Sequence, residues 1–297
     1  MLDWEFGALN DWIAMTVTGE GRRDLALDVF HPAGEANGAA VILLHGGGWA
    51  RGHRSATHGY ARALAAAGFV AIAAEYRLLG EAAFPAQVDD IRDTVRWVRA
   101  HAEELRIDPD MIALQGYSAG GHLALMVSGT QPGSGHEGKV GGTSDGSGVA
   151  AVVSFFAAAR LDSDPEAIEM PPFAALLNGG GMEAARAASP VHYVNAASPT
   201  TFIIGGTADF MQPLDAGLDL LRAYVAAGAE VEFHYLHSQT HEFCATPSVL
   251  PAIMDEVIFF YRRTLTERRA FEDEAKDLNP FARVSSFAEL MAAITPG

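Results

Sequence analysis

Short apolar runs and amphipathic stretches alternate along the chain from about residue 25 onward. Residues 39–44, 69–74 and 201–204 are nearly uninterrupted apolar runs, which are typical of strands buried on both faces of a parallel sheet. Residues 25–30 alternate apolar and polar positions, which predicts a strand with one face in solvent. After Pro85, apolar side chains recur at the 3.6-residue spacing of a helix face.

The same rhythm continues through most of the chain. Further strands are expected at 111–115, 149–155 and 231–236, and further helices at 61–67, 119–128, 214–227 and 249–265. Strands that alternate with helices of this length imply right-handed crossovers between parallel neighbours. The predicted fold class is therefore α/β, with a mostly parallel central sheet flanked by helices.

Three segments depart from this rhythm. Residues 131–148 are rich in Gly, Ser and Thr and are expected to form a mobile surface loop. Residues 156–198 hold several prolines and are expected to make an irregular, cap-like excursion over one face of the sheet. We predict one catalytic domain over 1–265 and a helical tail over 266–297, in which 286–289 has the pattern of a capping box.

The chemistry-bearing motif of the chain is Gly116-Tyr117-Ser118-Ala119-Gly120. It matches G-x-S-x-G and lies between a predicted strand and a predicted helix, the context that a nucleophile elbow requires. The pattern occurs a second time at 142–146, without a strand before it or a helix after it, so we expect Ser144 to face solvent. The simpler interpretation of Ser118 is a chance match at a strand-to-helix turn, and context favours the nucleophile.

A second motif, His45-Gly46-Gly47-Gly48, follows an earlier buried strand, where this kind of fold places an oxyanion loop. Glycines let backbone N–H groups approach a developing negative charge closely. We expect donors from Gly47, Gly48 and Ala119, and a structural role for His45. A flexible turn or a phosphate loop is the alternative, but no Gly-Lys-Ser/Thr sequence is present.

A serine nucleophile needs a base, and the base needs an acid to orient it. In the chain order Ser, acid, His, the acid is assigned to Asp209, directly after the strand at 201–204, with Asp162 as the alternative. The base is assigned to His241, in the loop after the last strand, ahead of His237. The spacing of these histidines does not predict a metal site.

Composition excludes several classes of function. The 297-residue chain carries a net charge of −17, which disfavours nucleic acids and anionic membranes as partners. One cysteine, Cys244, allows no internal disulfide, and residues 1–20 lack the basic and apolar segments of a signal peptide. No apolar run is long enough to span a bilayer. We expect a cytoplasmic protein and leave a homodimer open.

The motifs together resemble a known family. They occur in order as His45-Gly-Gly-Gly-Trp49, Glu75-Tyr-Arg-Leu78, Phe84-Pro85 through Asp89-Asp90, Gly116-Tyr-Ser-Ala-Gly-Gly-His122, Gly206-Thr-Ala-Asp209 and His241-Glu-Phe243. This set resembles the bacterial α/β-hydrolase esterases related to hormone-sensitive lipase, in the branch of acetyl-ester deacetylases and feruloyl-type esterases. The resemblance covers about residues 20–265, and it implies a serine nucleophile, an oxyanion hole from the glycine loop and no cofactor.

The predicted activity is hydrolysis of carboxylic esters of small molecules. Only 44 residues precede His45, which leaves little or no room for an N-terminal lid and favours short-chain acyl esters. Trp49 and Phe210 are candidates for the pocket wall, although relatives often carry Pro in place of Phe210. Amide or arylformamide hydrolysis would use the same triad. A peptidase is the second alternative, and a catalytically silent binding protein is the third.

Overall fold

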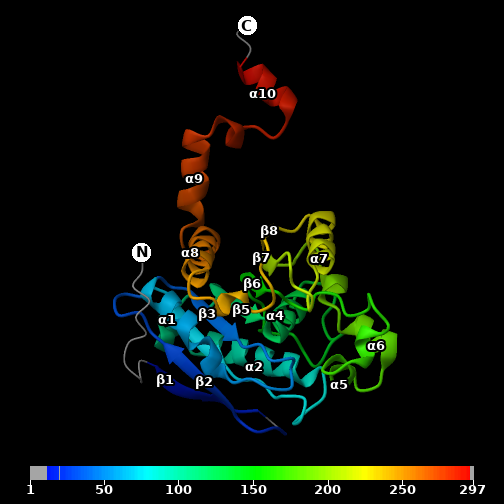
Figure 1. Ribbon diagram of the computed structural model, residues 1–297. Helices are drawn as coiled ribbons and strands as arrows, with labels where there is room; N and C mark the ends of the chain where they lie inside the picture. The colour runs from blue at the N-terminus through cyan, green and yellow to red at the C-terminus, as the bar shows by residue number, and fades with distance from the viewer. Residues whose placement is uncertain (1–11, 20, 295–297) are drawn as a thin grey trace.

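The computed structural model describes residues 12–19 and 21–294, and its centre is an eight-stranded sheet (Figure 1). The strand order is β1-β2-β4-β3-β5-β6-β7-β8. Strand β2 runs antiparallel to both of its neighbours, and every other pairing is parallel, so the predicted α/β class is confirmed. The strands are β1 Ile13–Val17, β2 Leu25–Phe30, β3 Ala40–Leu44, β4 Val70–Ala74, β5 Ile112–Tyr117, β6 Ala151–Phe155, β7 Thr200–Gly206 and β8 Val231–Leu236.

Helices cover both faces of the sheet and divide the core into two clusters. Helices α1 and α8 cover one face, with Leu64 and Val257 fully buried, while α2, α4 and α7 cover the other. The helices are α1 His58–Ala66, α2 Ala86–Ala100, α3 Ala102–Leu105, α4 Ala119–Gly129, α5 Phe173–Leu177, α6 Gly181–Ala187, α7 Leu214–Ala227, α8 Leu250–Tyr261, α9 Arg268–Leu278 and α10 Phe287–Ile294. The predicted helices and strands are all present, with ends that shift by a few residues.

The prediction of a wet face on residues 25–30 is wrong. Every residue of β2 except Ala26 is buried, including Asp28. The carboxylate of Asp28 accepts from His58 Nε2 at 2.8 Å and pairs with Arg54 Nε at 2.9 Å. The polar position therefore marks a buried ionic contact beneath a helix, because β2 lies between β1 and β4 and is not an edge strand.

The glycine-rich segment 131–148 is held in place rather than free. Three arginines on α2 donate at 2.7 Å to its backbone: Arg92 to Val140 O, Arg96 Nε to Asp145 O and Arg99 Nη2 to Gly148 O. The expectation for Ser144 is also wrong, since this residue is 1% exposed. A loop outside helices and strands leaves backbone carbonyl oxygens without regular partners, and these oxygens are the acceptors that the arginines use.

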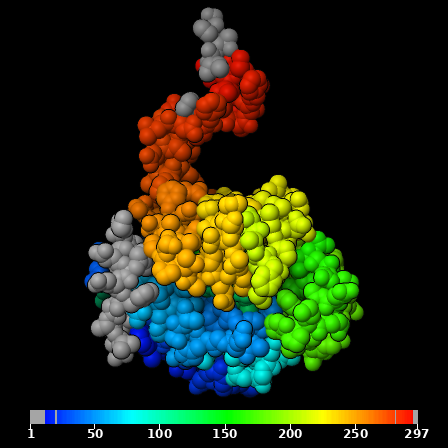
Figure 2. All heavy atoms as spheres, in the orientation of Figure 1, coloured from blue at the N-terminus to red at the C-terminus, as the bar shows by residue number. Residues whose placement is uncertain are grey.

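Two segments add to the sheet and the helices that cover it, and the first of them, 156–198, packs Leu161, Leu176 and Tyr193 into the core. Residues 156–198 contain α5 and α6, and Pro171-Pro172 at the start of α5 borders the site described below. Helices α9 and α10 stand off the body in Figures 1 and 2. The described residues do not include 1–11, part of the segment in which no signal peptide is predicted. They also do not include 295–297, the end of the predicted tail. In the described ranges, no helix combines the length and apolar character needed to cross a bilayer.

Candidate active site

The two glycine motifs lie in loops that directly follow neighbouring strands, at the carboxyl ends of both strands. Strands β3 and β5 are parallel and adjacent, and Leu44 at the end of β3 pairs with Gly116. The chain passes from β3 to β4 on one side and later to β5 on the other, so this is the point where the strand order reverses. In open α/β sheets, binding sites form at such a point, beyond the carboxyl ends of the strands.

Ser118 occupies a turn that only small neighbours permit. Its φ of 52° is in the left-handed region, which L-residues rarely adopt. A Cβ on Gly116 would lie 2.2 Å from the carbonyl oxygen of Gly120, and a Cβ on Gly120 would lie 2.2 Å from that of Leu44. The amide of Ser118 donates to Phe155 O at 2.9 Å, which fixes the turn against β6. The strained turn thus sets the side chain of Ser118 at the N-terminus of α4.

Ser118, His241 and Asp209 form one hydrogen-bonded chain. His241 Nε2 lies 2.9 Å from Ser118 Oγ, and His241 Nδ1 lies 2.8 Å from Asp209 Oδ2. A carboxylate accepts only, so Nδ1 donates to Asp209 and Nε2 accepts from the serine hydroxyl. Asp209 Oδ1 accepts from the amides of Met211 and Gln212 at 2.8 and 2.9 Å, which fixes its orientation. The arrangement can activate a hydroxyl by general-base catalysis.

The competing sequence candidates lie in other contacts. Asp162 pairs with Arg160 at 3.5 Å and accepts from His192 Nε2 at 2.8 Å. Burial tends to raise the pKa of this carboxyl, but the hydrogen bond and charge of His192 and the charge of Arg160 outweigh burial and lower it. His237 contacts the Ser238 hydroxyl at 3.0 Å, and His234 pairs with Glu256 on the outside of β8. Asp162, His234 and His237 therefore make no hydrogen bond to Ser118 among the described residues.

The glycine loop presents amides to the space in front of Ser118. Gly47 has a φ of 120°, and a Cβ there would lie 2.1 Å from the carbonyl oxygen of Arg51. Gly48 has a φ of 60°, and its Cβ would lie 2.8 Å from Pro172 Cγ. Among the described residues, the amides of Gly47 and Gly48 have no hydrogen-bond partner. Ala119 is the first residue of α4, where an amide also lacks an intrahelical acceptor.

Two buried side chains to which the sequence pattern gave no role, His122 and Tyr76, hold this loop in place. His122 Nε2 donates to Ala188 O at 2.8 Å, so Nδ1 accepts from Trp49 Nε1 at 3.1 Å. Burial lowers the pKa of His122 to about 4. Tyr76 donates to His45 O at 2.8 Å and its ring stacks on the His45 imidazole. The one sequence feature that could have pointed to a role for His122 is its place at the end of the motif Gly116–His122.

Two cavities meet at Ser118. The first, which we name the serine groove, has a volume of about 490 Å³ and is bordered by Gly47, Gly48, Ser118 and His241. The second, which we name the short pocket, has about 270 Å³ and is bordered by Ser118, Tyr60, Phe156 and Cys244. Burial raises the pKa of the Cys244 thiol to about 12, so this residue is an apolar wall at neutral pH.

The two aromatic candidates for the pocket wall have different surroundings. Trp49 borders the serine groove but is only 2% exposed, and it packs edge-on against His122 and Phe173. Phe210 is 82% exposed and borders a separate, adjacent cavity. In residues 12–19 and 21–294, no group of three or more His, Cys, Asp or Glu side chains is placed to hold a metal ion.

The chain matches the BD-FAE family model over residues 27–223. Among curated proteins of Mycobacterium tuberculosis, it is 29% identical over 213 residues to the probable carboxylic ester hydrolase LipM, covering 66% of this chain and 48% of LipM. It is 26% identical over 266 residues to the esterase LipQ, covering 84% of this chain and 62% of LipQ. The chain thus spans less than two thirds of the length of either relative.

A solved structure shares the architecture. Esterase 2 of Thermogutta terrifontis, in its propionate-bound form, aligns with a TM-score of 0.70 at 25% identity. The alignment covers 84% of this chain and 93% of that chain. The protein therefore has the α/β-hydrolase fold of an esterase, with the serine groove at the carboxyl edge of the sheet.

Proposed function

Because the chain belongs to the BD-FAE family, we propose that it is a serine carboxylesterase that hydrolyses short-chain esters of small molecules. One observation carries the proposal: the hydrogen-bonded chain from Ser118 Oγ through His241 to Asp209, beside a glycine loop with unpaired amides. Esterase names among the curated relatives support the same reaction class.

The proposed cycle is acyl transfer through an ester of Ser118. His241 takes the hydroxyl proton as Ser118 Oγ attacks the carbonyl carbon, and Asp209 stabilises the imidazolium. The amides of Gly47, Gly48 and Ala119 donate to the oxyanion. The alcohol leaves with the proton from His241, and a water molecule, activated by the same imidazole, then releases the acid.

The walls around Ser118 support a preference for short acyl chains. The short pocket is bordered by Tyr60, Phe156 and Cys244 and offers only about 270 Å³. The propionate-bound state of the Thermogutta terrifontis esterase is a precedent for a short acyl group in this fold. Trp49 stays a proposed wall residue of the serine groove, and Phe210 a proposed rim residue beside it. A cytoplasmic location and a homodimer stay predictions from the sequence.

The test is hydrolysis of p-nitrophenyl esters from acetate to decanoate by the wild type and by Ser118→Ala. We expect turnover to peak at the short chains and to fall by about 10⁴-fold or more in the variant. Aryl formamides are assayed in parallel. Undiminished turnover by Ser118→Ala would overturn the nucleophile assignment, and cleavage of formamides without cleavage of esters would replace the esterase with an amidase.

A further inference from the structure

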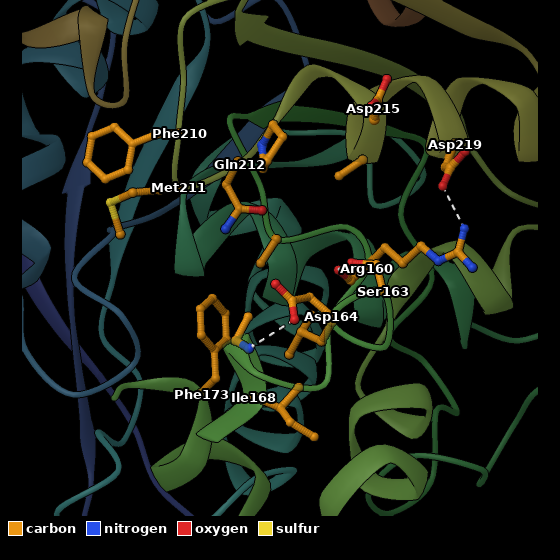
Figure 3. Close-up of a pocket in the computed structure, with 15 residues that line it drawn as sticks. Arg160, Ser163, Asp164, Ile168, Phe173, Phe210, Met211, Gln212, Asp215 and Asp219 are labelled. Atoms are coloured by element: carbon orange, nitrogen blue, oxygen red, sulfur yellow. Dashed lines mark hydrogen bonds and ion pairs between the residues drawn. The ribbon is translucent and has the colours of Figure 1, made fainter. Parts of the chain in front are cut away.

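A third cavity lies beside the serine groove, and we name it the side chamber (Figure 3). Its volume is about 350 Å³, within the range of small-molecule pockets. Ala158, Phe173, Met211 and Gln212 border both cavities. A molecule bonded to Ser118 can therefore extend from the serine groove past these residues into the side chamber.

The side chamber is amphipathic along its length. Phe173 and Met211, which also border the serine groove, lie on one side of the chamber in Figure 3, with Ile168 below Phe173 and Gln212 beside Met211. The opposite part carries Arg160 and Ser163, with Asp219 beyond them. A ligand that fills it needs an apolar stem and a polar end.

The polar part carries an excess of negative charge. The single cation there, Arg160, is neutralised by Asp219, with 2.6 Å between Arg160 Nη1 and Asp219 Oδ2. Asp164 and Asp215 also border the chamber, and neither forms a salt bridge with a cationic side chain in the part of the chain that the structure describes. Asp164 Oδ1 accepts only from nearby backbone amides, including that of Glu166 at 2.8 Å. In Figure 3, Asp164 lies between Phe173 and Arg160, so the carboxylates are spread along the chamber. The chamber therefore attracts hydrogen-bond donors and cations and repels carboxylates.

An ester has two arms that diverge from the carbonyl carbon, and two spaces diverge from Ser118. The short pocket is the smaller space, and aromatic rings, the Cys244 thiol and Glu242 border it. The serine groove and side chamber together are larger and carry several polar groups. We propose that the short pocket takes the acyl arm, and that the side chamber selects alcohol arms ending in a hydroxyl or ammonium group. This inference rests on the proposed esterase function and names its substrate class.

The test is a matched series of acetate esters whose six-carbon alcohol arm ends in a methyl, hydroxyl, ammonium or carboxylate group. Initial rates are followed by acid release. We expect kcat/KM to rank ammonium and hydroxyl above methyl, and carboxylate last, with about a tenfold span or more between the charged ends. Asp164→Asn/Asp215→Asn should shrink the ammonium-to-carboxylate ratio several-fold. The matched control, Asp24→Asn/Asp255→Asn, removes two exposed carboxylates outside the chamber and should keep the wild-type ratio.

A second series places the same end groups on the acyl arm of methyl hexanoate. Selectivity in this series, and none in the alcohol series, would overturn the assignment of the arms. Equal kcat/KM across the alcohol series, or an equal change in both double variants, would overturn the chamber as a selective site. Absence of p-nitrophenyl acetate hydrolysis would instead refute the proposed function itself, so the two failures are distinguishable.

Discussion

At the residue scale, the assignment of the acid shows what sequence order could and could not decide. Asp209 and Asp162 each follow a strand, and both positions are compatible with a triad acid. The structure distinguishes the two carboxylates by their contacts. His241 contacts Asp209, whereas Asp162 forms ionic contacts with Arg160 and His192. Local motif and chain order were enough to propose Ser118 and His241, whereas the choice of the carboxylate partner depends on contacts between distant segments.

Asp209→Asn should abolish most of the activity. The amide removes the charge that stabilises the imidazolium and favours the wrong tautomer of His241, so we expect kcat to fall by about 10⁴-fold. Steady-state hydrolysis of p-nitrophenyl acetate measures this loss. Asp162→Asn is the control: it weakens the contacts with Arg160 and His192, so it should lower the melting temperature and leave kcat unchanged. The reverse pattern would transfer the acid role to Asp162.

His122 should make folding stability depend on pH. Its folded-state pKa of about 4 lies below the ordinary value of 6.5, because burial disfavours the imidazolium. Between these values the unfolded chain binds the proton more readily, so stability falls as pH decreases from about 6.5 to about 4, by roughly 3 kcal/mol in all. A protonated Nδ1 would also face the Trp49 N–H donor.

The measurement is urea unfolding of the wild type and His122→Gln at several pH values from 7 to 4.5. The variant should be less stable at pH 7, because glutamine cannot reproduce both ring contacts. Its stability should fall less steeply with decreasing pH, so that the difference from the wild type narrows. Parallel pH profiles for the two proteins would show that His122 does not contribute this dependence.

At the element scale, strands and helices followed from hydrophobic periodicity, but the contacts that hold the loops did not. Strand β8 was predicted at its observed bounds, since its ends coincide with changes of pattern. The hydrogen bonds that hold residues 131–148 were not predicted, because the sequence pattern of α2 identified only its apolar face and gave no role to its arginines. A period of 3.6 identifies the face that packs on the sheet, and it carries no information about which distant carbonyl oxygens the other face meets.

The glycine loop offers a test at this scale. Gly47→Ala places a Cβ 2.1 Å from the carbonyl oxygen of Arg51 at a φ of 120°, so the loop must move. We expect displaced oxyanion donors and a fall in kcat of about 10²-fold or more, with a smaller change in KM. Gly80→Ala is the matched control, since a Cβ there meets no atom within 4 Å, and it should behave as the wild type. Equal kinetics in both variants would remove Gly47 from the oxyanion hole.

At the scale of the whole molecule, the site depends on the reversal of strand order at β3 and β5, while the tail lies apart from it. Sequence alternation predicted this architecture because each βα unit leaves its own periodic signal. It predicted α9 and α10 only as helical, because their position is set by few contacts. Phe271 packs edge-on against Phe259 with 5.5 Å between centroids, and Arg268 pairs with Glu230 at 3.1 Å.

Removal of residues 268–297 should therefore leave the enzyme-like body intact. No residue of α9 is buried, and exposed ion pairs such as Arg268–Glu230 each contribute no more than about 1 kcal/mol. We expect the truncated protein to keep kcat/KM for p-nitrophenyl acetate and to melt within about 4 °C of the full chain. Leu278, Phe281 and Phe287 are 76%, 65% and 75% exposed, so their removal should also reduce concentration-dependent association in sedimentation velocity runs. A loss of kcat/KM on truncation would mean that the tail supports the serine groove, in conflict with its place in the fold.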